Sequence, residues 1–157
     1  MTDHASAAPD LVETSLAVIA GGQTSSGAFL AGPTFSQYGY CWFRDGAFIA
    51  EALDKMGRLE SSARFHRWVA RVLVAQAGNL RRAREAARAG QVPGPADYLH
   101  CRYGADGSPS HDDGWPTFQL DGPGIWLWSL AHHLLHGGRL EGEVREAAAT
   151  AARYLGD

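Results

Sequence analysis

Residues 38–57 read YGYCWFRDGAFIAEALDKMG and combine the start of a helix with a cluster of aromatic and charged side chains. From Asp45 to Met56 the apolar residues recur at helical spacing, and Gly57 is a typical helix stop. An aspartate in the first turn is favoured by the helix dipole, and a neighbouring arginine offers its donors in a fixed fork. The segment therefore predicts a helix whose entrance displays Arg44 and Asp45.

Four further segments show helical periodicity. They are Leu11–Ile19, Phe65–Leu73, Ile125–Leu135 and Val144–Leu155. The segment at 125–135 is apolar almost all round, which indicates burial on several sides, whereas the others carry an apolar stripe. Residues 98–103 alternate enough to predict a short strand or extended arm. About five helices, striped ones alternating with buried ones, predict an all-α fold of helical hairpins with inner and outer members.

The composition is that of a globular protein in one domain, residues 1–157, with 45% hydrophobic and 20% charged residues. A formal net charge of -3 favours neither nucleic acid nor an anionic membrane as a partner, and no apolar stretch is long enough to span a bilayer. The N-terminus lacks the basic and apolar regions of a secretory signal, so we expect a cytoplasmic protein. Cys41 and Cys101 have no partner at metal-ligand spacing and are expected to be reduced packing residues.

A second mixed cluster, WPTFQLDGP at residues 115–123, also stands at the entry to a predicted helix. Asp121 could cap that helix, and capping and packing explain the first cluster equally well. Sugar sites, however, need flat apolar faces for pyranose rings together with carboxylate, amide and guanidinium groups for hydroxyls. Both clusters offer that mixture, so residue types alone leave a structural and a sugar-binding interpretation open.

The two clusters, taken with their spacing, resemble glycoside hydrolase family 15, the family of glucoamylases, glucodextranases and bacterial trehalases. The run from Ser15 to Val69 contains SGAFLAGP at 26–33 and YCWFRD at 40–45, and QLDGPG follows at 119–124. The resemblance covers nearly the whole chain in order. It implies an (α/α)6 barrel of six helical hairpins with a funnel-shaped active site at one end, of which this chain would form rather less than half.

The resemblance also implies roles for residues at matching positions of the first motif. Arg44 and Asp45 match the pair that hydrogen-bonds the hydroxyls of the terminal glucose unit. Tyr38 and Trp42 match aromatic residues that line the same pocket. These four are the expected substrate-binding residues of the first cluster.

The second motif is expected to add three substrate-binding residues. Trp115 matches a tryptophan that closes over the substrate. Gln119 and Asp121 belong to the motif itself, where they either contact the sugar or brace the loop. The resemblance leaves these two roles open.

No catalytic residue is assigned within this chain. The family hydrolyses with inversion, which requires a general acid and a general base roughly 6.5 to 9.5 Å apart. The resemblance implies that both lie beyond Asp157, so we expect a chain truncated before the general acid and leave open whether it is itself an enzyme. Asp112 and Asp113 are adjacent carboxylates, but an acidic pair in a loop of this kind is interpreted as a solvated loop tip.

The sequence leaves three functional hypotheses open. The first is the N-terminal part of a hydrolase whose parent activity acts on a maltooligosaccharide, dextrin or trehalose, with a complementary C-terminal chain as partner. The second is a non-catalytic carbohydrate-binding or interaction protein that keeps the sugar pocket. The third is a helical protein in which both clusters only cap helices and no sugar binds selectively.

No cofactor and no metal site are expected from the sequence. His132 and His136 stand four residues apart and could bind a metal from one helix face. The sequence offers no third ligand near them, so this pair is interpreted as structural.

Overall fold

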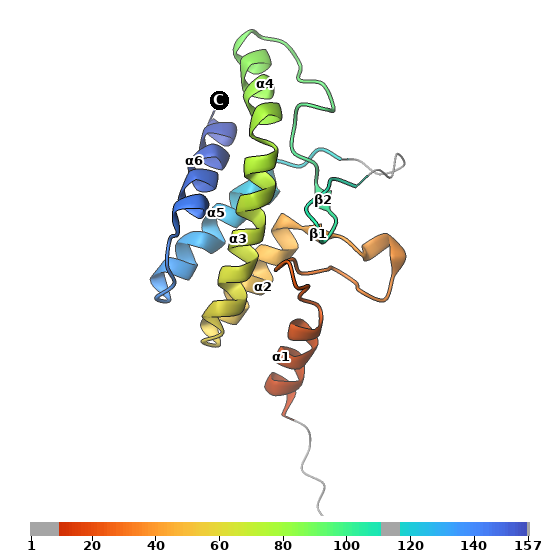
Figure 1. Ribbon diagram of the computed structural model, residues 1–157, viewed down its shortest axis with the longest axis vertical. Helices are drawn as coiled ribbons and strands as arrows, with labels where there is room; N and C mark the ends of the chain where they lie inside the picture. The colour runs from red at the N-terminus through yellow and green to blue at the C-terminus, as the bar shows by residue number, and fades with distance from the viewer. Residues whose placement is uncertain (1–9, 111–116, 157) are drawn as a thin grey trace, which may run out of the picture.

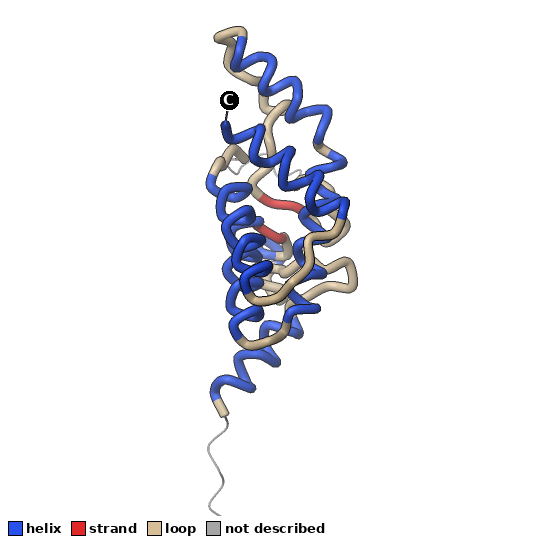
Figure 2. The backbone as a smooth tube through the Cα atoms, turned by 90° about the vertical axis from the view of Figure 1, so that its left-hand side faces the viewer, coloured by secondary structure: helices blue, strands red, loops and turns tan. Residues whose placement is uncertain are grey.

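The computed structural model describes residues 10–110 and 117–156. Within these residues lie six α-helices, one short 3-10 helix and two short strands (Figures 1 and 2). The helices are α1 (Leu11–Gly21), α2 (Phe43–Lys55), α3 (Leu59–Ala75), α4 (Ala77–Arg88), α5 (Asp121–Leu135) and α6 (Gly142–Gly156), with η1 at Ser36–Tyr38 and strands β1 at Cys41–Trp42 and β2 at Arg102–Tyr103. The predicted all-α fold is therefore confirmed.

Helices α2 and α3 form one hairpin, and α5 and α6 form another. Gly57 ends the first helix of the α2–α3 hairpin in a left-handed conformation with φ 72°, which a residue with a side chain rarely adopts. The next residue, Arg58, donates its backbone N–H to the Leu53 carbonyl, so the turn is closed by the pattern typical of a helix end. The helix stop predicted at Gly57 is thus the turn between the two members of a hairpin.

The first helices of the two hairpins lie side by side and run in the same direction. Contacts between them advance together along both helices: Arg44 with Asp121, Ala47 with Ser129, Glu51 with His132, and Asp54 with His133. The second helices, α3 and α6, also pack against each other (Figure 1). This layering of hairpins is what part of an (α/α)6 barrel requires, and it places the N-terminal ends of α2 and α5 together.

The core fills the space between the hairpins. Its largest buried side chains include Trp68, Trp126, Phe65 and Tyr103, each no more than 1% exposed. The expected burial of α5 on several sides holds where neighbouring helices cover it but not along the whole helix, because Leu135 is 82% exposed. Helices α2, α3 and α6 pack against α5, and Trp128 and Leu134 of that helix remain partly exposed.

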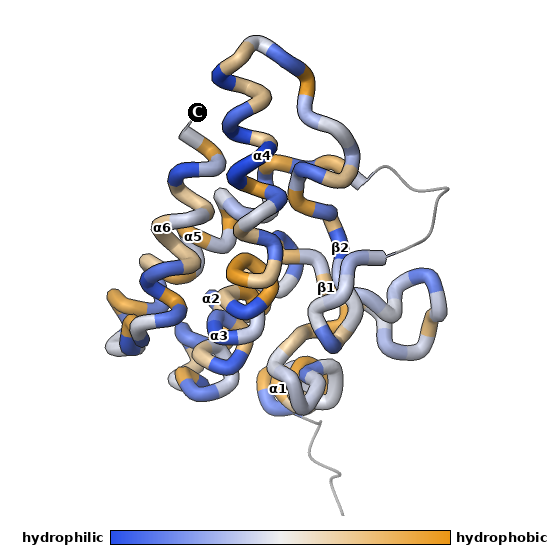
Figure 3. Tube along the Cα trace, turned by 45° about the horizontal axis from the view of Figure 1, so that its top comes forward, coloured by the Kyte–Doolittle hydropathy of each residue, from blue (hydrophilic) through white to orange (hydrophobic). Residues whose placement is uncertain are grey.

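Helix α4 was not among the helices predicted from the hydrophobic periodicity of the sequence. It follows α3 after a break at Gln76, and its buried side chains are Leu80 and Ala83. Hydrophilic and apolar residues alternate along α4 (Figure 3), and its few buried side chains form a narrow apolar stripe, as is typical of a helix on the outside of a fold. Of the helices that the structure describes, none is both long and apolar enough to cross a membrane.

Candidate functional site

The entrances of α2 and α5 meet in a cluster of three charged side chains, Arg44, Asp45 and Asp121, here called the Arg44 cluster. Arg44 Nη1 donates to Asp121 Oδ2 at 2.7 Å, and Arg44 Nε lies 3.4 Å from Asp45 Oδ1. The three side chains are 40% to 44% exposed, so each keeps contact with solvent while it pairs with the others. Two segments that are 77 residues apart in the chain are joined by this contact.

Local sequence explains why these groups stand where they do. Asp45 lies in the first turn of α2 and Asp121 in the first turn of α5, where the positive ends of the helix dipoles favour carboxylates. The hydrogen bond to Asp121 is the main reason that the pKa of Arg44 is raised above its ordinary value, so the guanidinium stays charged. Donors and acceptors therefore lie side by side at a partly exposed surface, an arrangement suited to hydroxyl groups.

Asp121 does not cap α5 in the way that the structural interpretation supposed. Leu120 is the N-cap residue, and it makes no side-chain capping bond. Asp121 is the first residue of the helix, and its carboxylate pairs with Arg44 instead. Asp121 is therefore not the N-cap of α5, and it links the second motif to the first.

An aromatic wall adjoins the cluster and is held by a short antiparallel ladder. In that ladder Trp42 pairs with Arg102. Trp42 is 5% exposed and contacts the rings of Tyr38 and Tyr40, whereas Tyr38 itself is 44% exposed. Tyr38 is therefore the member of the wall most accessible to a ligand.

Arg102 is a functional candidate that sequence reasoning missed. Its side chain is buried, its guanidinium lies 4.9 Å from the centre of the Tyr40 ring and 5.9 Å from that of Trp42, and its Nε donates to Ser110 Oγ at 3.0 Å. Such cation–π contacts hold aromatic rings in place. The available signal was an arginine inside the alternating arm at 98–103, but only the strand register puts it beneath the wall.

The remaining predicted residues stand apart from this cluster or outside the described part of the chain. Gln119 is half-buried, and no hydrogen bond or ion pair among the described residues joins it to the Arg44 cluster. Trp115 lies outside the described residues, as do Asp112 and Asp113. Cys41 and Cys101 are both buried, as expected of packing residues, and burial raises the pKa of both thiols.

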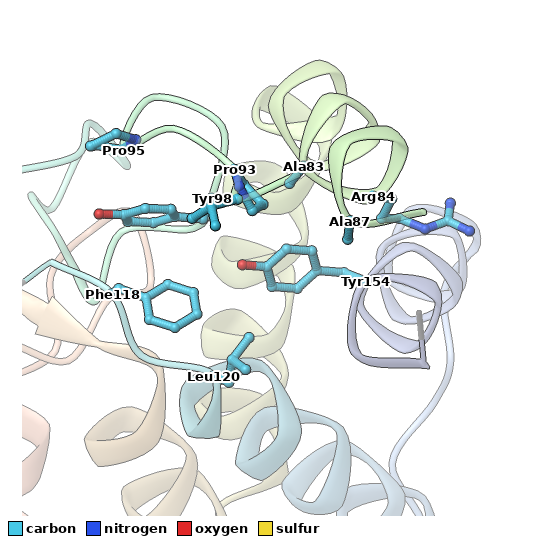
Figure 4. A pocket seen from close by; sticks show the side chains of 10 residues that line it. Ala83, Arg84, Ala87, Pro93, Pro95, Tyr98, Phe118, Leu120 and Tyr154 are labelled. Carbon is cyan, nitrogen blue, oxygen red and sulfur yellow. The ribbon is translucent and has the colours of Figure 1, made fainter. Parts of the chain in front are cut away.

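A cavity of about 510 Å³ lies next to the second motif but does not contain the charged cluster. Figure 4 shows the rings of Tyr98, Phe118 and Tyr154 around it, with Leu120 below them and the Arg84 guanidinium pointing away. Its lining is mostly apolar, whereas a sugar needs several convergent hydrogen-bonding groups. We therefore place the candidate site at the Arg44 cluster and the aromatic wall.

Comparisons with known proteins point to one family. The family model described as glycosyl hydrolases family 15 matches residues 10–157. An isomaltose glucohydrolase from Kribbella flavida is 42% identical over 134 residues, which are 84% of this chain and 34% of that protein.

Solved structures give the same result. A wild-type glycosidase superimposes with a TM-score of 0.83 at 40% identity and covers 91% of this chain and 38% of its own. A variant glycosidase in complex with glucose matches with the same TM-score, identity and coverage. The chain thus spans about a third of the length of the curated relative and 38% of these structures.

Proposed function

This chain belongs to glycosyl hydrolase family 15, and on that basis we propose that its Arg44 cluster binds the terminal glucose unit of an α-glucoside. The observation that carries the proposal is the 2.7 Å contact between Arg44 and Asp121, which unites the two motifs at the entrances of parallel helices. A guanidinium donates and carboxylates accept, so adjacent sugar hydroxyls find both partners in one place. Tyr38 supplies an exposed apolar face on which a pyranose ring packs, and the buried Trp42 ring supports Tyr38 from behind.

The substrate class is proposed from two relatives. One similar protein is an isomaltose glucohydrolase, and one similar structure holds glucose. We take isomaltose as the first ligand to test, with maltooligosaccharides, dextrin and trehalose as the alternatives within the same class. Trp115, Gln119 and Asp121 are proposed to close or brace the pocket on the side of the second motif.

The role of the chain in the reaction is proposed to be binding rather than proton transfer. Inverting hydrolysis needs an acid and a base on opposite faces of the sugar. We propose that these two groups come from parts of the hydrolase other than these 157 residues, which span about a third of the curated relative. The alternative, a non-catalytic sugar-binding protein, would use the same pocket. The two hypotheses differ in one outcome: a binding protein would show no hydrolysis even when a second chain supplies the other helices of the barrel.

Replacing Arg44 with alanine is expected to weaken isomaltose binding roughly tenfold or more, because hydrogen bonds to charged groups contribute about 1.5–3 kcal/mol. Binding is measured by ligand-observed NMR titration of the 157-residue chain. Arg81→Ala is the matched control, since Arg81 is an exposed arginine on α4, and it should leave affinity unchanged. Equal affinity of wild type and Arg44→Ala would reject the proposed pocket.

The chain alone is expected to release glucose from isomaltose, maltose or trehalose no faster than a buffer blank. Binding without differential stabilisation of the transition state produces no rate enhancement. Glucose is measured with a coupled enzymatic assay over a day. Release that disappears on Asp112→Asn or Asp113→Asn would show that these carboxylates are catalytic, contrary to our interpretation.

A further inference from the structure

A second group of polar side chains joins α2 to α5 toward their C-terminal ends, away from the Arg44 cluster. His132 lies in the last turn of α5 and His136 is the C-cap residue that follows the helix, and Glu51 of α2 lies beside them. Each residue offers a nitrogen or carboxylate oxygen, and these three atoms lie within 4.8 Å of one another. The third ligand that the histidine pair lacks in sequence is thus supplied by a residue 81 positions from His132.

Glu51 is buried and incompletely paired. Its side chain is 4% exposed, and its Oε1 lies 3.0 Å from both His132 Nδ1 and Lys55 Nζ. Its Oε2 is also buried, and among the described residues it has no hydrogen-bond partner. A buried carboxylate oxygen without a partner is costly, and a cation in contact with it would remove that cost.

The separation of Glu51 and His132 fits a small tetrahedral ion. A glutamate carboxylate is one of the oxygen ligands that zinc accepts in proteins. Ligand atoms at about 2.0–2.1 Å from zinc are about 3.3 Å from one another, close to the 3.0 Å between Glu51 Oε1 and His132 Nδ1. His132 is 34% exposed at its side chain and His136 is exposed, so both rings can turn and an ion can enter from solvent. Two histidines and one glutamate leave a fourth position for water.

We propose that Glu51, His132 and His136 bind a zinc ion that clamps α2 to α5. The ion would replace the Lys55 contact at Glu51 and link the two parallel helices of the hairpins. Zinc rather than magnesium or calcium is indicated because two of the three ligands are imidazoles, whereas those harder cations take oxygen ligands.

A neighbouring buried group is the weaker candidate. Asp54, His66 and His133 also lie within reach of one another, but Asp54 already pairs with His133 and Ser62, and His66 accepts a bond from a tryptophan. These three side chains are at most 3% exposed, far less than His132 at 34%, so an ion would have to reach a much more deeply buried position. The two groups can be distinguished by separate variants.

The test uses the 157-residue chain without a histidine tag, titrated with zinc chloride in a calorimeter. One zinc ion per chain and a rise in the melting temperature are expected. His132→Gln, His136→Gln and Glu51→Gln should each weaken zinc binding at least about tenfold. Lys55→Met should strengthen it about two- to fivefold, because the competing ammonium is removed; a purely structural ion pair gives no such gain.

His66→Gln is the control for the buried group and should leave zinc affinity unchanged. Circular dichroism confirms that every variant has the helical content of the wild type. Zinc binding that persists in His132→Gln but is lost in His66→Gln would overturn the proposal, as would a wild-type chain that gives neither heat nor a change in melting temperature.

Discussion

Replacing Trp126 with alanine is expected to lower the free energy of unfolding by about 3–5 kcal/mol. Trp126 is fully buried on α5 where both hairpins meet, and its Nε1 donates to His66 Nδ1 at 3.1 Å. The substitution therefore opens a large cavity and removes the partner of a buried ring nitrogen. No other single truncation is expected to destabilise the packing of α5 against α3 more.

The matched control for this prediction is Trp128→Ala. Trp128 lies two residues further along the same helix and is 39% exposed, against 0% for Trp126. Its truncation should cost no more than about 1.5 kcal/mol. Both values are measured by urea unfolding followed by circular dichroism, and equal losses for the two tryptophans would contradict the packing described above.

Acid is expected to destabilise the fold through His66. Burial is the main cause that lowers the pKa of His66 from 6.5 to about 3, and the nearby charge of His133 adds to it. Between pH 6.5 and 3 the His66 side chain is protonated in the unfolded chain but neutral in the folded chain. The free energy of unfolding is therefore highest above pH 6.5, and it decreases as the pH falls toward 3. With roughly 1.4 kcal/mol per pH unit, the loss is about 2 kcal/mol at about pH 5.

The variant His66→Asn isolates this contribution, because it leaves the neighbouring buried side chains of Asp54 and His133 unchanged. Asparagine has no charge to gain and keeps an acceptor for the Trp126 indole. The free energy of unfolding is measured from about pH 7.5 to about pH 4.5 for wild type and variant. The free energy of unfolding should decrease more steeply below pH 6.5 for the wild type than for the variant. Parallel curves would show that His66 is protonated as easily in the folded chain as in the unfolded chain, which would contradict the prediction.

The Arg44 cluster and the proposed zinc site both depend on how α2 packs against α5, because each of them joins residues of these two segments. Arg44 reaches Asp121 at the entrances of the helices, and Glu51 reaches His132 nearer their ends. A change that shifts α5 along α2 by one turn would separate both pairs. The Trp126 variant therefore also provides a sensitive test of whether sugar binding depends on this packing.

The sequence by itself determined the helical class, the stop at Gly57 and the position of both motifs at helix entrances. These features depend on neighbours three or four residues away, so they can be read without knowing the fold. The same local information predicted a helix over 125–135 and a short extended arm that ends at Tyr103, and the structure contains both. Family membership followed from the order and spacing of two such motifs.

Only the tertiary structure decided which of these residues meet. Arg102 lies beneath the aromatic wall because the strand register pairs it with Trp42, and Glu51 reaches His132 because α2 and α5 run parallel. The partners in the Arg44 contact are separated by 77 residues, and those in the Glu51 contact by 81. Contacts over such distances depend on how whole helices pack against a common core, which no periodicity within one segment specifies.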